Sequence, residues 1–371
     1  MSLKILVTGA DGFIGKNLCL QLGERNFEVF RFVRSSNLNF LEDCISKADA
    51  IIHLAGENRP KDPTDFETTN VVLTNVLCDL VAKYTKTIPI VFASSIQAEL
   101  DNPYGSSKLA AEKKLINLVK KLDISLAIYR LPGVFGKWCK PNYNSVVATF
   151  CHNIANGFPI KINDSTANLK LVYVDDVVDS FINFVSNPGS ASELYSAINN
   201  EYEITLGCLA DQIRSFKNVK ESLITDDVGT GFTRALYSTY LSYLPVSEFS
   251  YEVPKYGDER GDFVEMLKTK SSGQFSYFTA HPGVTRGGHY HHTKTEKFLV
   301  VRGKARFKFK NIVTQEQHEL IVNGDKPEIV DTVPGWSHDI TNIGETELVV
   351  MLWANEIFDR DRPDTYAMSL N

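Results

Sequence analysis

The segment KILVTGADGFIGKNL, residues 4–18, joins an apolar run to a glycine-rich turn and then to an amphipathic stretch. Gly9, Gly12 and Gly15 follow a predicted strand and precede a predicted helix, in GxxGxxG spacing. Glycines in this position permit a tight turn and let the backbone approach a pyrophosphate, whose charge lies at the helix N-terminus. The strand–turn–helix context therefore favours a dinucleotide site over a glycine-rich turn without function.

The sequence after this segment alternates between strand and helix patterns. The stretches FEVFRFVR (27–34), ADAIIHLAG (48–56) and IPIVFASS (88–95) are apolar strand candidates. Continuous Ile, Val and Leu strands separated by helices indicate a parallel sheet that is covered on both faces. We therefore predict an α/β protein with an N-terminal Rossmann-type doubly wound sheet over residues 1–247.

Residues 248–371 show a different pattern. Short runs such as EKFLVVRG, ARFKFK and ELVVMLW are separated by glycine and proline. This spacing is typical of an antiparallel sandwich or small barrel, so the second domain is predicted to be all-β.

Overall composition excludes several classes of protein. Of the 371 residues, 43% are hydrophobic and 23% are charged, as in ordinary globular proteins, and the net charge is −6. The chain has no Lys/Arg block, which argues against a nucleic-acid partner, and no apolar run of the roughly 18–20 residues that span a membrane. Six scattered cysteines without CxxC spacing suit a reducing compartment. The N-terminus enters a strand pattern directly, so we expect no secretory signal and a cytoplasmic protein.

The end of the second predicted strand distinguishes NAD from NADP. Proteins that prefer NAD usually carry an acidic residue there for the ribose hydroxyls. This chain has Arg31, Arg34 and Ser35 and no acid, and a cation there suits the 2′-phosphate of NADP. Arg34 is the better candidate because strand alternation turns Arg31 to the other face. An exposed surface arginine is the alternative interpretation.

A Tyr-x-x-x-Lys spacing occurs three times, starting at Tyr104, Tyr251 and Tyr290. Only Tyr104 and Lys108 open a predicted helix that follows an apolar strand, which ends at Ser95. One helical turn places Tyr104 and Lys108 on the same face. The lysine lowers the pKa of the phenol, which can then protonate a developing alkoxide while a serine hydroxyl holds the same oxygen.

In combination, TGADGFIG, HLAG, YGSSK, RLPGVFG and YVDDVV resemble the extended short-chain dehydrogenase/reductases that act on nucleotide sugars, over about the first 240 residues. The resemblance implies that Ser95, Tyr104 and Lys108 form the catalytic triad, with Tyr104 as the acid and Lys108 also binding the nicotinamide ribose. Sugar-nucleotide dehydratases of this family place an Asp-Glu pair after the catalytic Ser or Thr, whereas Ile96 and Gln97 follow Ser95 here. This difference favours simple reduction over dehydration. The resemblance implies NADPH contacts at Gly9, Gly12, Phe13, Ile14, Gly15, Arg34, Ser35, Leu54, Ala55 and Lys108.

A second set of reactive residues lies in the β-rich part. The pattern G-x5-H-x-H-x4-E-x6-G runs from Gly283 to Gly303. Two histidines in alternate positions face the same side of a strand, and an acid can approach them from the adjoining strand. A lone His-x-His would most often bind nothing, but the full spacing and a later histidine favour a metal site. We expect one divalent metal, with zinc preferred over Fe, Ni or Mn, on His289, His291, Glu296 and His338.

These motifs resemble the two motifs of the cupin family, with Pro334-Gly335 shifting the usual proline of the second motif by one position. YGDERGDFVE (256–265) and RGGHY (286–290) further resemble cupin-type deoxysugar epimerases related to dTDP-4-keto-6-deoxyglucose 3,5-epimerase. In those enzymes the histidine of the second motif is a base without a metal, whereas His289 here fits the ligand pattern. The two roles exclude each other, so the identity of the base stays open. Candidates for gripping the substrate are Arg260, Glu265 and Arg286, with surface ion pairs as the alternative.

End to end, the chain is similar to the CapF-type bifunctional enzymes of bacterial capsule and O-antigen synthesis. The resemblance implies that the cupin epimerises C3 of a UDP-4-keto-6-deoxy-N-acetyl-L-hexosamine. The reductase then reduces C4 with NADPH to give UDP-2-acetamido-2,6-dideoxy-L-talose, on the route to UDP-N-acetyl-L-fucosamine. The order is chemically necessary, because the C3 proton is acidic only while C4 is a ketone. Both families commonly pair their subunits, so a homodimer is expected.

Alternative functions remain open at this point. The chain could be an NAD-retaining 4-epimerase fused to an isomerase, although the missing acid after the second strand counts against this. The cupin could instead be a metal-braced sugar-binding or dimerisation module without catalysis of its own. A non-enzymatic NADP sensor is disfavoured by the intact set of Ser95, Tyr104 and Lys108.

Overall fold

The computed structural model describes residues 2–59, 62, 66–188, 193–258, 261–264, 267–269, 273–356, 359 and 361–370. The chain forms two compact units. The first comprises Met1–Phe135, Asn142–Ser145 and Leu169–Glu203, and the second comprises Gly136–Pro141, Val146–Asn168 and Ile204–Asn371.

The first unit is built on a five-stranded parallel sheet with the order β2-β1-β3-β4-β5. The central strands are buried apolar runs, as their sequences predict, because helices cover both faces. The predicted Rossmann-type sheet is confirmed. Its strands are β1 (Lys4–Thr8), β2 (Glu28–Phe32), β3 (Ala50–His53), β4 (Ile90–Ser95) and β5 (Leu126–Leu131).

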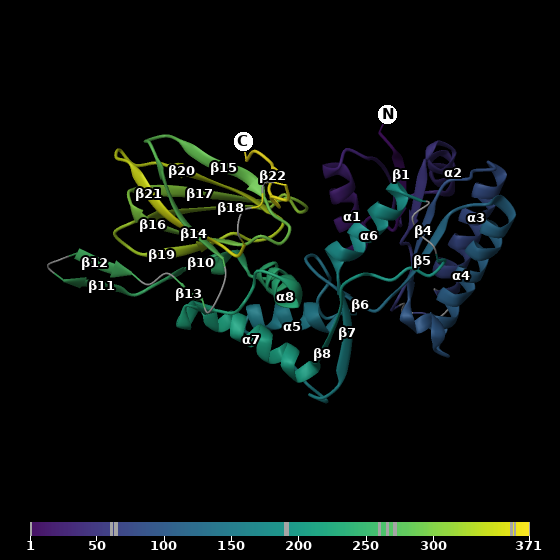
Figure 1. Cartoon of the computed structure of the whole chain (residues 1–371), viewed down its shortest axis with the longest axis horizontal. Helices are drawn as coiled ribbons and strands as arrows, with labels where there is room; N and C mark the ends of the chain where they lie inside the picture. Colours follow the sequence, from purple (N-terminus) through teal and green to yellow (C-terminus); the bar gives the residue numbers. More distant parts are fainter. Residues whose placement is uncertain are drawn as a thin grey trace. The chain divides into compact units, whose positions relative to one another are not determined.

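Helices lie on both sides of this sheet (Figure 1). The helices α1 and α6 contact each other on one face, and α2, α3 and α4 pack together on the other. The second face holds a core of buried aliphatic residues from the strands and these three helices. The bounds are α1 (Phe13–Glu24), α2 (Leu38–Lys47), α3 (Leu73–Lys83), α4 (Pro103–Leu122) and α6 (Val174–Ser186). A small sheet of β6 (Gly133–Phe135), β7 (Asn168–Tyr173) and β8 (Glu201–Thr205) follows.

The second unit contains two five-stranded sheets, with orders β10-β19-β16-β21-β14 and β18-β17-β20-β15-β22. All the pairings within them are antiparallel, which confirms the all-β architecture predicted for residues 248–371 (Figure 1). Phe307 and Phe309 alternate with Arg306 and Lys308 along β17, so that phenylalanines fill the interior and cations face outward. The bounds are β10 (Ser250–Glu252), β14 (Gln274–Ala280), β15 (Thr285–Tyr290), β16 (Glu296–Arg302), β17 (Lys304–Asn311), β18 (Gln317–Asn323), β19 (Glu328–Asp331), β20 (Trp336–Asn342), β21 (Leu348–Ala354) and β22 (Tyr366–Ala367).

Within the described part of the second unit there are also three α-helices: α5 (Val146–Ala155), α7 (Leu206–Ser222) and α8 (Gly231–Leu241). The last of them, α8, ends four residues before Pro245. In the division into compact units, residues 204–247 therefore belong with the β sheets, although the sequence analysis predicts that they are part of the first domain. Compactness and family membership are different criteria, so the boundary at 247–248 stays a prediction. No helix among the described residues is long and apolar enough to cross a membrane.

Candidate functional site

The glycine-rich turn connects β1 to α1. Gly9 has φ +68°, and a Cβ there would lie 2.8 Å from the amide nitrogen of Ala55. A Cβ on Gly15 would lie 2.2 Å from the carbonyl oxygen of Gly9. The hydroxyl of Thr8 accepts hydrogen bonds from the amides of Leu54 (3.2 Å) and Ala55 (3.1 Å). The structure thus brings the predicted glycines together with Leu54 and Ala55.

The N-terminus of α1 fits an anionic group. Gly12 is the N-cap and has no side chain to cap the amides of the first turn, which begins with Phe13 and Ile14. Uncapped amides at a helix N-terminus are suited to a pyrophosphate. The residues present therefore fit a dinucleotide.

The arginines after β2 are paired with two acids that sequence reasoning did not single out. Arg34 Nη2 lies 2.6 Å from Glu57 Oε2, and its side chain is 86% exposed. Arg31 Nη2 lies 3.0 Å from Asp11 Oδ1, which is also exposed. Ser35 is exposed beside Arg34. An exposed guanidinium can exchange its carboxylate partner for a phosphate at little cost, so Arg34 stays a prediction for the 2′-phosphate.

Ser95 and Lys108 lie in the buried region at the carboxyl end of β4. Ser95 ends this strand, and Lys108 in the second turn of α4 donates from Nζ to the carbonyl of Ala93 at 2.8 Å. Burial lowers the pKa of Lys108 to about 8, while the carboxylate of Glu112 opposes this shift. Burial raises the pKa of Tyr104, and a hydrogen bond with Ser95 opposes this shift. The first turn of α4 is fixed by Asn102, whose side chain accepts from Gly105 N at 2.8 Å.

Two further residues support this region and were missed from the sequence. The Asn70 amide accepts from Glu57 N at 2.7 Å and donates to the Ser107 hydroxyl at 2.9 Å, beside Lys108. Glu112 is fully buried and accepts from Arg130 Nη2 at 2.7 Å and from the Ser94 hydroxyl. The position of Glu112, four residues after Lys108 on a predicted helix, was the one available signal.

His289, His291, Glu296 and His338 form a compact group in the second unit. One possible ligand atom from each lies within 4.8 Å of the others. His291 Nε2 lies 3.2 Å and His338 Nε2 lies 3.4 Å from Glu296 Oε2. His289 is opposite His338 in the pairing of β15 with β20. The His-x-His pair and the later Glu and His therefore converge as the spacing predicts.

The electrostatics of this group fit a cation. Burial would raise the pKa of Glu296, but the imidazoles of His291 and His338 hold it well below its usual range. Burial, reinforced by the neighbouring His338 and His291, lowers the pKa of His289 to about 3. Among the described residues, neither ring nitrogen of the buried His338 has a hydrogen-bond partner. Neutral imidazoles, a carboxylate and an orphaned nitrogen are the donors expected of a divalent metal site.

A β-bulge sets the direction of the strand that carries His289. Gly287 and Gly288 have φ values of +99° and +77°, and the register with β20 shifts between Gly287 and His289. The extra residue lets Arg286 and His289 face the same side. Arg286 is exposed, with its guanidinium 5.1 Å from the ring centroid of Phe278. The other two predicted substrate residues, Arg260 and Glu265, lie outside the described residues.

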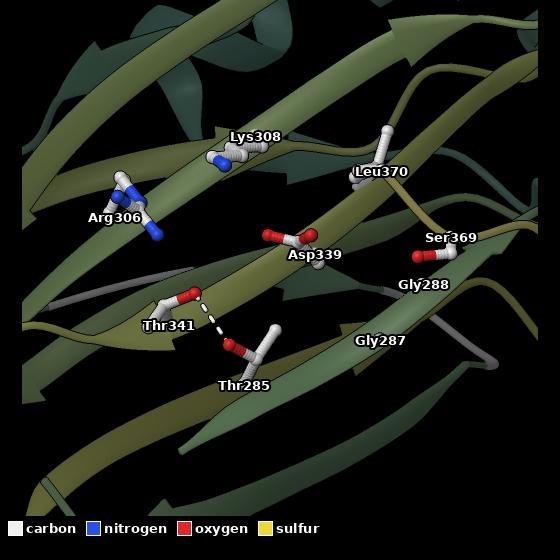
Figure 2. A pocket seen from close by; sticks show the side chains of 9 residues that line it. All are labelled: Thr285, Gly287, Gly288, Arg306, Lys308, Asp339, Thr341, Ser369 and Leu370. Atoms are coloured by element: carbon white, nitrogen blue, oxygen red, sulfur yellow. Dashed lines mark hydrogen bonds between the residues drawn. The ribbon is translucent and has the colours of Figure 1, made fainter. Parts of the chain in front are cut away.

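A separate polar cavity of about 310 Å³ lies on the outer face of the same sheet (Figure 2). Arg306, Lys308 and Asp339 point into it, and Thr285 hydrogen-bonds Thr341 across its floor at 2.8 Å. Burial raises the pKa of Asp339, opposed by Lys308 and Arg306. Asp339 follows His338 on β20 and therefore faces away from the imidazoles, so this cavity is distinct from the candidate metal site.

Comparisons with known proteins agree with this two-part organisation. Residues 5–197 match the NAD dependent epimerase/dehydratase family, and residues 256–366 match the polysaccharide biosynthesis C-terminal domain. The chain is 56% identical over 370 residues to UDP-2-acetamido-2,6-beta-L-arabino-hexul-4-ose reductase of Pseudomonas aeruginosa, covering 99% of both chains.

Two solved structures are also similar to this chain. The capsular polysaccharide assembling protein CapF of Staphylococcus aureus matches with a TM-score of 0.68 and 41% identity, over 99% of this chain and 100% of that one. A UDP-N-acetylglucosamine 4-epimerase of Bacillus cereus matches 65% of this chain and 96% of its own at 23% identity, with a TM-score of 0.53. The second likeness concerns the fold alone.

Proposed function

The chain belongs to the NAD dependent epimerase/dehydratase family, among the CapF-type enzymes that join this fold to a cupin, and from this premise we propose that it catalyses two consecutive reactions on one nucleotide sugar. The cupin epimerises C3 of a UDP-4-keto-6-deoxy-N-acetyl-L-hexosamine, and the reductase then reduces C4. The product is UDP-2-acetamido-2,6-dideoxy-L-talose, a precursor of UDP-N-acetyl-L-fucosamine for capsule or O-antigen.

One observation carries the reduction: Lys108 is buried one helical turn from Tyr104, and its Nζ donates to the Ala93 carbonyl of β4, the strand that ends at Ser95. The name of the Pseudomonas relative, a reductase of a 4-ulose, supports a C4 ketone as the substrate. NADPH, when bound, supplies the hydride that adds to C4. Tyr104 then donates its phenolic proton to the developing alkoxide, and Ser95 holds the same oxygen by a hydrogen bond.

Lys108 assists the transfer through its charge. Its ammonium, fixed by the Ala93 carbonyl, favours the phenolate that Tyr104 becomes after donating its proton. In this proposal Gly9, Gly12 and Gly15 approach the pyrophosphate, and Arg34 and Ser35 bind the 2′-phosphate that distinguishes NADPH from NADH. An enzyme that consumes NADPH and a UDP-sugar is proposed to act in the cytoplasm.

For epimerisation, the group of His289, His291, Glu296 and His338 is proposed to hold one divalent metal, with zinc preferred. When bound, such a metal supplies a Lewis acid or braces the barrel. Arg286 faces the same side as His289 and is proposed to grip the substrate together with Arg260 and Glu265, the two arginines being suited to its diphosphate. A ketone at C4 makes the C3 proton acidic, and later reduction locks the inverted centre.

Exchange of the C3 proton tests this proposal. The UDP-4-keto-6-deoxy-N-acetyl sugar is incubated with the enzyme in D₂O without NADPH, and C3 is followed by proton NMR. We expect exchange with the wild-type enzyme and with Tyr104→Phe, which lacks only the reducing acid, and loss of exchange with His338→Ala. If C3 keeps its proton while added NADPH still reduces C4, the cupin is a binding or dimerisation module and the two-reaction proposal is wrong.

A further inference from the structure

We propose that Asp364, in the C-terminal segment, is a positioning residue for the candidate metal site. It fixes the loop His291–Lys294 and holds a proton on Nδ1 of His291, so that Nε2 faces the other ligands. The inference rests on the proposed function, because it assumes that His291 binds a metal. It concerns a residue 73 positions from His291, outside both motifs that carry the histidines.

The Asp364 carboxylate accepts hydrogen bonds from three backbone amides of the loop. One oxygen accepts from His292 N at 3.0 Å. The other accepts from Thr293 N at 2.8 Å, Lys294 N at 2.6 Å and the Thr293 hydroxyl at 2.9 Å. The side chain is only 13% exposed, so these charge-assisted hydrogen bonds are largely shielded from water and set the path of the loop.

The Asp364 carbonyl determines the proton position on the ligand itself. His291 Nδ1 lies 2.6 Å from this oxygen, which can only accept a hydrogen bond. Nδ1 must therefore carry the proton, and the lone pair of a neutral His291 is on Nε2. Nε2 points at Glu296, inside the group of four. A metal-binding histidine is commonly oriented in this way by an acceptor on its other nitrogen.

Other contacts keep the C-terminal segment against the loop. Lys294 Nζ donates to the Pro363 carbonyl at 3.2 Å and to the Thr365 hydroxyl at 2.7 Å. Asp364 itself has φ +40°, a region that Asp and Asn enter more readily than most residues. These contacts and this backbone conformation hold Asp364 against the loop.

Helix α8 also holds this loop, and its Arg234 Nη2 lies 3.9 Å from Asp364 Oδ2. Ser238 donates to the Thr293 carbonyl at 2.9 Å, and Arg234 donates to the Thr293 hydroxyl. Arg234 also forms an ion pair with Glu356 at 3.0 Å. Asp364 differs from α8 in that its backbone carbonyl also contacts the His291 ring.

The first test substitutes the carboxylate. In Asp364→Asn the side chain keeps its size, and asparagine tolerates the positive φ. The NH2 of its amide, however, would face the backbone N–H groups of the loop and could not accept hydrogen bonds from them. The matched control is Asp361→Asn, which removes the same charge from an exposed position in the same segment. Metal-free proteins are titrated with Co²⁺, and the visible absorption bands and the Kd are recorded. We expect Asp364→Asn to raise the Kd roughly 10- to 100-fold and to alter the bands. A Kd and spectrum equal to those of the control would overturn the proposal.

The second test needs no variant, so it also decides the matter if Asp364→Asn does not fold. The wild-type chain is labelled with ¹⁵N-histidine, and long-range ¹H–¹⁵N correlations assign the protons of His291 in the metal-free protein. We expect a protonated Nδ1; an unprotonated Nδ1 would overturn the proposal. If the wild type binds no Co²⁺ or Zn²⁺ while Nδ1 is protonated, the metal site fails and the positioning of His291 stands.

Discussion

At the scale of single residues, the charge of Lys108 is balanced between two opposing effects. Burial lowers its pKa to about 8, and the buried Glu112 carboxylate one turn further along α4 raises it. Glu112 is itself paired with Arg130 at 2.7 Å. The ammonium form therefore predominates at neutral pH and is lost as the pH rises through about 8.

This balance predicts an alkaline limit on the reduction. We expect kcat/KM for NADPH oxidation, measured with the C3-inverted 4-keto sugar as the substrate, to fall above about pH 8, because kcat/KM reports groups of the free enzyme. Glu112→Gln removes the negative charge that stabilises the Lys108 ammonium, so the fall in kcat/KM should begin at a lower pH. Glu99→Gln is the control, because Glu99 also pairs with Arg130 (2.7 Å) but is exposed. An equal shift for both variants would contradict a specific effect of Glu112.

The residues that sequence reasoning found share one property: their partners are near in sequence or belong to a known motif. Tyr104 and Lys108 are four residues apart on one helix, and His289 and His291 are two apart. The roles of these residues stay predictions. Asn70 and Asp364 were missed because their contacts join segments that are distant in the sequence, and no sequence spacing predicts such contacts.

At the scale of elements, the turn between β1 and α1 requires glycine for two different reasons. Gly9 has a positive φ, whereas Gly15 is in the first turn of a regular helix and needs space. A Cβ on Gly15 would lie 2.8 Å from Ala10 Cα as well as 2.2 Å from the Gly9 oxygen. Both are backbone atoms of the turn, which cannot move aside without displacing it.

Gly15→Ala should therefore destabilise the protein and weaken NADPH binding. We expect a loss of about 1–3 kcal/mol in the free energy of unfolding, measured in urea, as for other overpacked sites. Gly23→Ala is the control within α1, because a Cβ there would meet no described atom within 4 Å apart from its chain neighbours and the nearby backbone of its own helix. Alanine in this open helical position should stabilise by about 0.5–1 kcal/mol. Similar effects of the two substitutions would contradict the packing argument.

Whether a segment forms a helix or a strand could be predicted where its own pattern of buried and exposed residues decides it. The strands β1, β3 and β4 are continuous apolar runs because both faces are covered, and β17 alternates because one face is solvated. The bulge at Gly287–Gly288 was not predicted, because a pair of glycines does not reveal the register of its partner strand. The grouping of α8 with the sheets was also missed, since its contacts with Thr293 cross 55 or more residues.

At the scale of the whole molecule, each compact unit contains one of the two candidate sites. Ser95, Tyr104 and Lys108 belong to the first unit, and the four metal-site residues belong to the second. The proposed intermediate is a complete UDP-sugar ketone, which no covalent bond joins to either site. The homodimer expected from the two families stays a prediction.

This separation predicts that two inactive variants can complement each other. Tyr104→Phe should epimerise but not reduce, and His338→Ala should reduce only a sugar that is already inverted at C3. Neither variant alone should oxidise NADPH with the non-inverted ketone. Their mixture should do so, because the ketone made by one variant can reach the reducing site of the other. NADPH oxidation is followed at 340 nm, a wavelength where only the reduced cofactor absorbs.

Two controls make this result decisive. His338→Ala must still oxidise NADPH with the pre-inverted ketone, and Tyr104→Phe must still exchange the C3 proton in D₂O. If both controls hold and the mixture stays inactive, the ketone is not released between the reactions. If His338→Ala alone reduces the non-inverted ketone at the wild-type rate, epimerisation does not precede reduction, because the reducing site then accepts a sugar that the cupin has never inverted.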